Sequence, residues 1–171
     1  MKPVNALRLT RTLAVSILLL VSAARASAEE ALSMQGTWTL TSAYEIQANG
    51  TRSTNYGEHA QGLLMVDAAG RYSLQIFRPD RRKFASGAKP TGTPDEFRDA
   101  VLGSSTHTGR VRVDAPKHQL IFDIETASFP NWEGTQQIRE YVFEKDTLTY
   151  SVPASASGNG TIAYSVWKRA E

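Results

Sequence analysis

From residue 36 onward the chain alternates apolar and polar residues, and this period of two constrains the fold more than any other feature. Around Tyr72, Leu74 and Ile76, for example, each apolar residue is separated from the next by a polar one. Such alternation is typical of β-strands that bury one face and expose the other. It predicts eight strands, at residues 37–46, 63–67, 71–78, 105–114, 118–126, 135–144, 147–152 and 161–169.

The connections between these strands alternate in length. Tight turns follow the second, fourth and sixth strands, whereas long loops at 48–61, 79–104, 127–134 and 153–160 follow the others. Successive connections of an up-and-down antiparallel sheet lie at opposite ends, so the long loops are expected on one rim. An open sheet would leave two exposed edges, and an immunoglobulin-like sandwich would need crossing connections. The chain is therefore predicted to be all-β, an eight-stranded up-and-down antiparallel barrel.

One short helix is predicted inside the long loop after the third strand. Thr93 suits the N-cap position, Pro94 suits the first helical position, and Glu96 completes a capping box with Thr93. Gly103 is expected to end this helix in the left-handed backbone conformation.

The first 28 residues have the features of a cleaved signal peptide. Basic residues precede an apolar run at 13–22, which is about half as long as a membrane span, and small residues precede two cleavage sites. Cleavage is expected after Ala28, with Ala26 as the second choice. The signal peptide is then 1–28, and the barrel domain is 29–171. We expect a periplasmic or secreted protein with no stable membrane span after cleavage.

Charge and composition exclude several classes of function. Removing the signal peptide takes away four of the 19 basic residues and none of the 17 acidic ones, so the formal net charge falls from +2 to −2. The mature chain therefore lacks the basic excess that nucleic-acid binding requires. Cysteine is absent and the three histidines lack metal-ligand spacing. No nucleic-acid partner, disulfide, metal or other cofactor is predicted.

Several motifs, in this order, resemble the bacterial lipocalin-like domain family. They are "GTWTLTSA", "GRYSLQIFRPDRRKFASG", "GTPDEFRDAV", "FPNWEGTQQIREYVF", "TLTY" and the closing "VWKR", and they span about residues 35–169. The resemblance implies a lipocalin or calycin-type barrel that carries a small apolar molecule. The helix-bearing loop after the third strand departs from the true lipocalins.

The "GTW" motif suits the closed end of such a barrel. The first strand begins and the last strand finishes at the end where the tight turns lie, so Trp38 can fill the floor. Gly36 lets the backbone pass close to the indole. Arg169 or Lys168 can cover the ring through a cation–π contact of about 1 kcal/mol. These residues are predicted to be structural.

The sixth predicted strand has two possible orientations. If Tyr141 and Phe143 point inward, Arg139 does too, and an interior Arg-x-Tyr pair resembles the carboxylate clamp of fatty-acid-binding barrels. If Ile138 and Val142 point inward, Arg139 lies outside. An interior arginine would need an anion or an acidic residue beside it, because an unpaired buried charge is costly.

Other candidate ligand-binding residues lie on inward faces or on the long-loop rim. Arg78, near the mouth, either binds a ligand carboxylate or pairs with Asp80 in the loop. His107 either acts as a base or is a hydrogen-bonded wall residue. The aromatic residues predicted to line or cap the interior are Tyr44, Tyr72, Phe122, Phe129 and Trp132.

Three functions are compatible with these features. The preferred one is binding of a small hydrophobic molecule, with or without a carboxylate, in a cavity of a few hundred cubic ångströms. A small-barrel cyclase or isomerase is the second, and a buried His107 bonded to a carboxylate would favour it. An inhibitor-like module is the third, and exposed Phe84 and Trp132 on the rim would favour it. An enzyme is the less favoured reading because no nucleophile–base set is visible.

Overall fold

The computed structural model describes residues 32–153, 155–158 and 160–170. The predicted signal peptide, residues 1–28, lies outside the described residues and stays a prediction. The described strands are β1 (Gly36–Ile46), β2 (Arg52–Ser53), β3 (Gln61–Val66), β4 (Arg71–Phe77), β5 (Ser104–Asp114), β6 (Gln119–Ala127), β7 (Gln136–Glu144), β8 (Thr147–Val152) and β9 (Ile162–Arg169). The described helix is α1 (Pro94–Leu102), and short 3₁₀ turns are η1 (Lys89–Thr91), η2 (Ala115–Lys117) and η3 (Pro130–Trp132).

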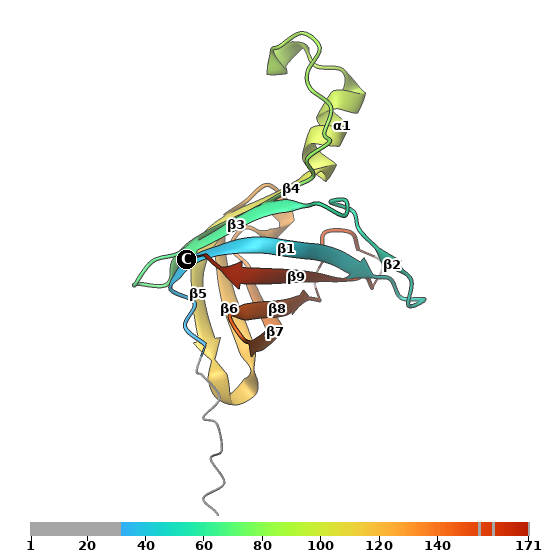
Figure 1. Cartoon of the computed structure of the whole chain (residues 1–171). Coiled ribbons are helices and arrows are strands. Elements are labelled where there is room, and N and C mark those ends of the chain that lie inside the picture. Colours follow the sequence, from blue (N-terminus) through green and yellow to red (C-terminus); the bar gives the residue numbers. More distant parts are fainter. Residues whose placement is uncertain (1–31, 154, 159, 171) are drawn as a thin grey trace, which may run out of the picture. The chain divides into compact units, whose positions relative to one another are not determined.

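The strands form one antiparallel sheet that closes on itself. β1 and β3 to β9 pair in sequence order, and β1 also pairs with β9, which completes an eight-stranded ring (Figure 1). This closure confirms the predicted barrel. The ninth strand, the short β2, pairs only with the last residues of β1. β2 was not expected, because a strand of two residues has no alternation that could reveal it.

The predicted helix forms, but two details differ. It follows β4 rather than a third strand, since β2 adds one strand before it. Thr93 and Glu96 make the full capping box, as expected. Gly103 has a φ of −88°, so the left-handed prediction is wrong. Glycine fits there for another reason, because a Cβ atom would lie 2.6 Å from the Arg81 side chain and 2.8 Å from a backbone oxygen.

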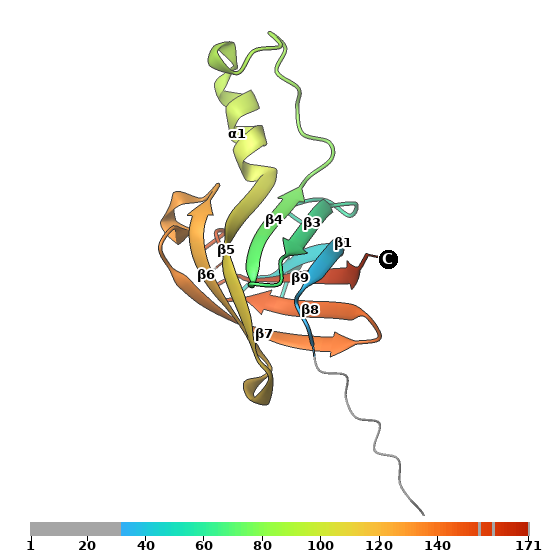
Figure 2. The same ribbon diagram turned by 90° about the vertical axis from the view of Figure 1, so that its left-hand side faces the viewer.

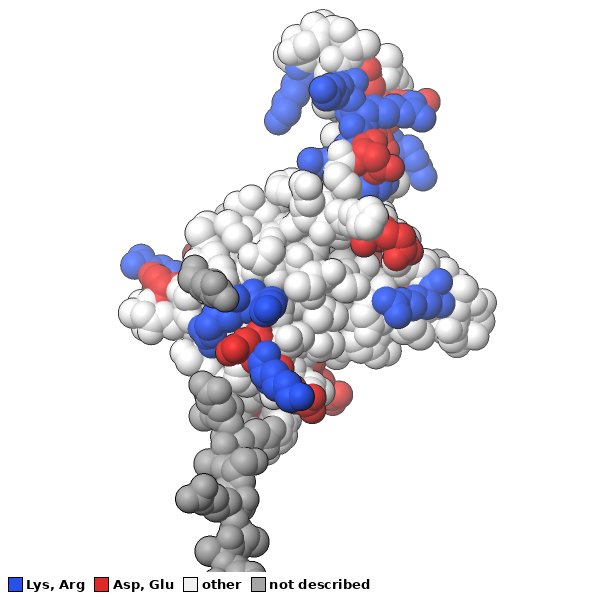
Figure 3. Space-filling model, in the orientation of Figure 1, with Lys and Arg blue, Asp and Glu red and all other residues white. Residues whose placement is uncertain are grey.

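Helix α1 and the segment before it project beyond the ends of β4 and β5 (Figure 2). Basic and acidic side chains are interspersed over this projection (Figure 3). One of the pairs, Arg82 with Asp95, has 3.6 Å between the charged atoms and is mostly exposed. Such surface pairs contribute little to stability. Among the residues described, no helix has the length and apolar character needed to cross a membrane.

A bulge in β1 reverses the predicted orientation of its second half. The register of β1 against β9 shifts between Leu40 and Ser42. Before the shift Trp38 and Leu40 are buried, and after it Ala43 and Glu45 are buried. The prediction that Tyr44 shares the inner face is therefore wrong, because one extra residue in a strand moves all later side chains to the opposite face.

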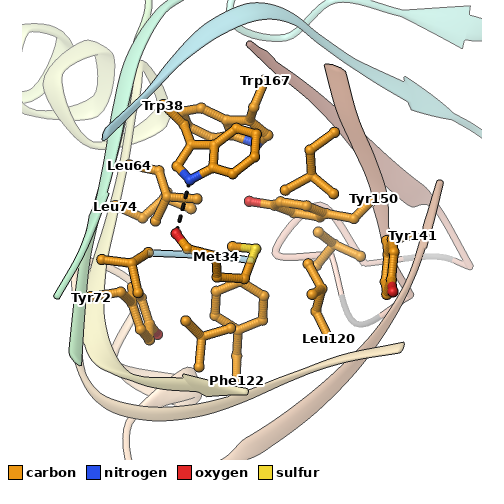
Figure 4. Packing of buried hydrophobic residues seen from close by; sticks show 14 of the residues in the cluster. Met34, Trp38, Leu64, Tyr72, Leu74, Leu120, Phe122, Tyr141, Tyr150 and Trp167 are labelled. Carbon is orange, nitrogen blue, oxygen red and sulfur yellow. Dashed lines mark hydrogen bonds between the residues drawn. The ribbon is translucent and has the colours of Figure 1, made fainter. Parts of the chain in front are cut away.

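The floor of the barrel is filled by large side chains. Trp38 and Trp167 are fully buried, and the leucines and aromatic rings labelled around them in Figure 4 are buried as well. The Trp38 indole donates a hydrogen bond from Nε1 to the Met34 carbonyl at 3.0 Å. Arg169 lies over this indole, with 4.2 Å between Cζ and the ring centroid. Gly36 has a φ of 122°, and a Cβ atom there would lie 3.3 Å from the Arg169 guanidinium.

Candidate functional site

A cavity of about 60 Å³ lies between the packed floor and the long-loop rim. Its walls include His107, Trp132, Arg139 and Tyr150. The predicted volume of a few hundred cubic ångströms is too large, because Trp38, Trp167, Phe122 and Tyr150 fill much of the barrel interior (Figure 4).

The cavity adjoins a wider depression at the mouth. This depression has a volume of about 480 Å³. The two share lining residues from β1, the first long loop, β5 and the last long loop, among them Glu45, Tyr56, Ser105 and Ser157. The inner cavity and the mouth depression are therefore neighbours on either side of these shared residues.

Arg139 is the most unusual residue of this site. Its side chain comes from β7 and is only 1 % exposed, while Ile138 and Val142 are 50 % and 58 % exposed. The pairing of β7 with β6 and β8 thus turns Arg139 inward, which decides between the two orientations left open by the sequence.

The guanidinium of Arg139 has no acidic partner among the described residues. Nη2 donates to Oε1 of Gln137 at 2.8 Å, and Cζ lies 4.2 Å from the Phe122 ring centroid and 5.3 Å from that of Tyr150. The Tyr150 hydroxyl is near enough to affect the pKa of Arg139 but lies outside hydrogen-bond geometry, and Nε is buried without a partner. Burial lowers the pKa of Arg139, yet an arginine stays charged.

His107 links Arg139 to Tyr72. The Tyr72 hydroxyl lies 2.8 Å from Nδ1 of His107, and Nε2 lies 3.5 Å from Nη2 of Arg139. Because a guanidinium can only donate, this contact requires an unprotonated Nε2, so we assign the proton to Nδ1, which donates to the Tyr72 oxygen. Burial first, and the Arg139 charge second, hold the pKa of His107 well below 6.5.

His107 is expected to make stability depend on pH. In the unfolded chain it takes up a proton near its ordinary pKa of 6.5, whereas the folded barrel keeps it neutral to a much lower pH. Below about pH 6.5 the unfolded state therefore binds more protons than the folded state. As the pH is lowered through this range, His107 decreases the free energy of unfolding by up to about 1.4 kcal/mol per pH unit.

Urea unfolding at pH 7, 6 and 5 measures this slope. His107→Gln should remove the contribution, while His59→Gln, at an exposed loop position, should keep it. An unchanged slope in His107→Gln would show that other groups cause the pH dependence.

Two of the rim aromatics lie at the cavity and its mouth, and a third packs against helix α1. η3 brings Trp132 against His107, with 5.6 Å between ring centroids. Phe129 packs edge-on against Trp132 at 5.8 Å and lines the mouth depression. Phe84 packs against Phe97 at 5.4 Å.

Five other residues that were predicted to bind the ligand do not line the inner cavity as expected. Arg78 pairs with Asp99 and with Asp80, the latter at 2.9 Å, and borders the mouth only. Tyr141 is buried beside His118, at 5.9 Å between rings, and does not join Arg139. Tyr44 touches the cavity edge, but its ring stacks on Tyr164 at 5.0 Å. Tyr72 and Phe122 do not line the cavity. Tyr72 contacts His107, and Phe122 packs against Arg139.

Sequence reasoning missed Glu45, a buried carboxylate in the cavity wall. The bulge in β1 places it there, and no residue pattern predicted that bulge. Gln137 was also missed, although it shares the inward face with Arg139 and could have been found by alternation.

The described residues contain no group of three or more side chains able to hold a metal ion.

Comparison with known proteins agrees with this architecture. The 4'-hydroxy-3'-methoxypropiophenone carrier protein ppsC of Aspergillus oryzae (strain ATCC 42149 / RIB 40) is 27% identical over 105 residues. That alignment covers 57% of this chain and 95% of the relative. A family model described as the lipocalin-like domain matches residues 35–170, which is most of the chain. This protein therefore belongs to the lipocalin-like domain family.

Proposed function

We propose that this protein carries a small, largely apolar molecule inside its barrel and that Arg139 binds an acceptor group of that molecule, such as a carboxylate or a carbonyl. The buried guanidinium, which has no acidic partner in the part of the chain that the structure describes, is the observation that carries this proposal. Taking a charge out of water costs several kcal/mol unless a counter-charge or strong acceptor compensates it. A bound acceptor would supply that compensation.

The related carrier supports the same type of ligand. By its name, that protein carries 4'-hydroxy-3'-methoxypropiophenone, an aromatic ketone. A ketone oxygen is an acceptor that a guanidinium can bind, and an aromatic ring suits a cavity bordered by Trp132 and Tyr150.

The size of the cavity favours small ligands. About 10–15 Å³ of such volume holds one water molecule, so about 60 Å³ accommodates roughly four to six groups of that size. This is at most about the size of one ring, so part of a substituted aromatic molecule would lie in the mouth depression. A coiled fatty-acyl chain would not fit without rearrangement.

Direct titration tests the proposal. The probe is 4'-hydroxy-3'-methoxypropiophenone, and the matched control is the same molecule with its ketone reduced to a methylene group. We expect saturable one-to-one binding of the ketone, measured by calorimetry and by tryptophan fluorescence. The control should bind at least about tenfold more weakly, because a hydrogen bond to a charged group contributes about 1.5–3 kcal/mol.

Absence of saturable binding for this probe and for simple aromatic carboxylates would contradict the proposal. Export is part of the same proposal, supported by the charge and apolar pattern of residues 1–28. If cleavage follows Ala28, protein recovered from the exported fraction will have the mass of residues 29–171.

Neither alternative function gains support from the site. His107 contacts Tyr72 and Arg139, and no hydrogen bond from it to a carboxylate is found in the described residues. The aromatics expected to face a protein partner are engaged within the molecule, since Phe84 packs on Phe97 and Trp132 packs on His107.

A further inference from the structure

Glu45 is the second buried charge of the cavity. It is 7 % exposed and lines both the inner cavity and the mouth depression. Its Oε1 accepts hydrogen bonds from the hydroxyls of Ser157 at 2.6 Å and Ser155 at 3.2 Å, and its Oε2 accepts one from the Asn55 amide at 2.5 Å. All three donors are uncharged, and no basic group lies within ion-pair distance among the described residues.

Glu45 and Arg139 have opposite charges but do not pair. Glu45 comes from β1 and Arg139 from β7, and β8 and β9 separate these strands in the ring. The polar partners of Glu45 belong to the long loops, whereas those of Arg139 lie on β7 and β5. The cavity thus has a donor pole at Arg139 and an acceptor pole at Glu45.

Each pole has unused hydrogen-bonding capacity. A carboxylate offers about four acceptor positions, and Glu45 uses three of them. Arg139 has five N–H donors, of which Nε is buried and has no hydrogen-bond partner among the described residues. Side chains such as Ile76 and Val152 complete the wall of the same cavity. A molecule that satisfies both poles needs a polar group at each end of an apolar body.

We propose that the ligand is a bifunctional aromatic molecule, with an acceptor group bound by Arg139 and a hydroxyl donor bound by Glu45. This inference rests on the proposed function, because it assigns the second end of the same ligand. The donor is a hydroxyl rather than an ammonium because the groups that already bind Glu45 are neutral, and two of them are hydroxyls. The ligand hydroxyl takes the acceptor position of Glu45 that its three present donors leave unused.

The experiment compares two aromatic ketones that differ at one end. 4'-Hydroxyacetophenone carries the donor, and 4'-methylacetophenone has nearly the same size without it. We expect the wild-type barrel to bind the hydroxyl probe at least about tenfold more tightly than the methyl probe. In Glu45→Gln this preference should shrink to within about threefold, with the affinity for the methyl probe unchanged.

Control variants separate the two ends of the ligand. Glu140→Gln, at an exposed position on β7, should keep the tenfold preference. Arg139→Met should weaken both probes by the same factor, since both carry the ketone. If Glu45→Gln does not fold, the two probes on the wild-type barrel still decide whether a donor is recognised.

Four results would overturn the inference. Equal affinity of the wild-type barrel for the two probes, or an equal effect of Glu45→Gln on both, would remove Glu45 from ligand recognition while leaving the proposed carrier function intact. Tighter binding of 4'-(aminomethyl)acetophenone than of the hydroxyl probe would replace the hydroxyl by an ammonium. Failure of every ketone and aromatic carboxylate to bind would overturn the carrier function as well.

Discussion

Replacing Trp38 with alanine is expected to lower the free energy of unfolding by about 3–5 kcal/mol, the usual cost of truncating a fully buried tryptophan. The indole packs edge-on against Phe143, with 6.2 Å between ring centroids, and donates to the Met34 carbonyl. Its removal leaves a cavity in the floor and frees the segment that it holds.

The contacts of Arg169 increase this cost. Its guanidinium covers the indole and donates to the carbonyls of Ser33 at 2.7 Å and Gln35 at 2.8 Å. The Arg169 side chain thus holds residues 33–35 against the floor of the barrel. Without the Trp38 ring beneath it, the guanidinium loses the surface on which it packs. Unfolding in guanidinium chloride, followed by far-UV circular dichroism, measures the change in stability.

Trp132→Ala is the matched control for Trp38→Ala. Trp132 is only half-buried at the rim, so its loss should cost clearly less stability while affecting ligand binding more. A loss below about 1.5 kcal/mol in Trp38→Ala would mean that the floor collapses around the missing ring and that Trp38 is not its main support.

Replacing Arg139 with methionine should have opposite effects on binding and on stability. Removing one partner of a buried charge-assisted contact weakens binding by about 2 kcal/mol or more, so a ligand with an acceptor group should lose at least about 30-fold in affinity. The empty barrel should become more stable by about 1–2 kcal/mol, because a flexible apolar side chain of similar length no longer requires desolvation of a charge. The gain stays small because Gln137 loses its donor.

Calorimetric titration and urea unfolding measure the two effects of Arg139→Met separately. Arg112→Met is the control, since its side chain is 58% exposed and pairs with Asp123 at 3.6 Å on the outer surface. It should change neither quantity by more than about 0.5 kcal/mol. A stability loss above about 2 kcal/mol in Arg139→Met, with unchanged binding, would identify Arg139 as a structural residue.

Local features of this protein could be predicted from the sequence alone. The capping box of Thr93 and Glu96 forms as expected, because its atoms lie within one turn of the chain. The inward positions of Tyr72, Leu74 and Ile76 follow from alternation within one regular strand. The contact between Arg169 and Trp38 could be anticipated, since closure of an up-and-down barrel brings its first and last strands together.

Tertiary structure alone decided the features that define the candidate site. Arg139 and Ile138 are neighbours on a strand whose two faces both contain apolar residues, so only pairing with β6 and β8 determines which face is inside. Glu45 faces inward because a bulge shifts the register of β1 by one residue, and such a shift depends on contacts with β9 that are distant in sequence.

The cavity volume depends on how far Trp38, Trp167 and Tyr150 fill the barrel, which is a property of three-dimensional packing. The barrel and the rim that carries the long loops follow from the sequence alone, because alternation and loop length are local properties. The two opposed charges in a small cavity arise only when the strands come together, because register and packing depend on residues far apart in the chain.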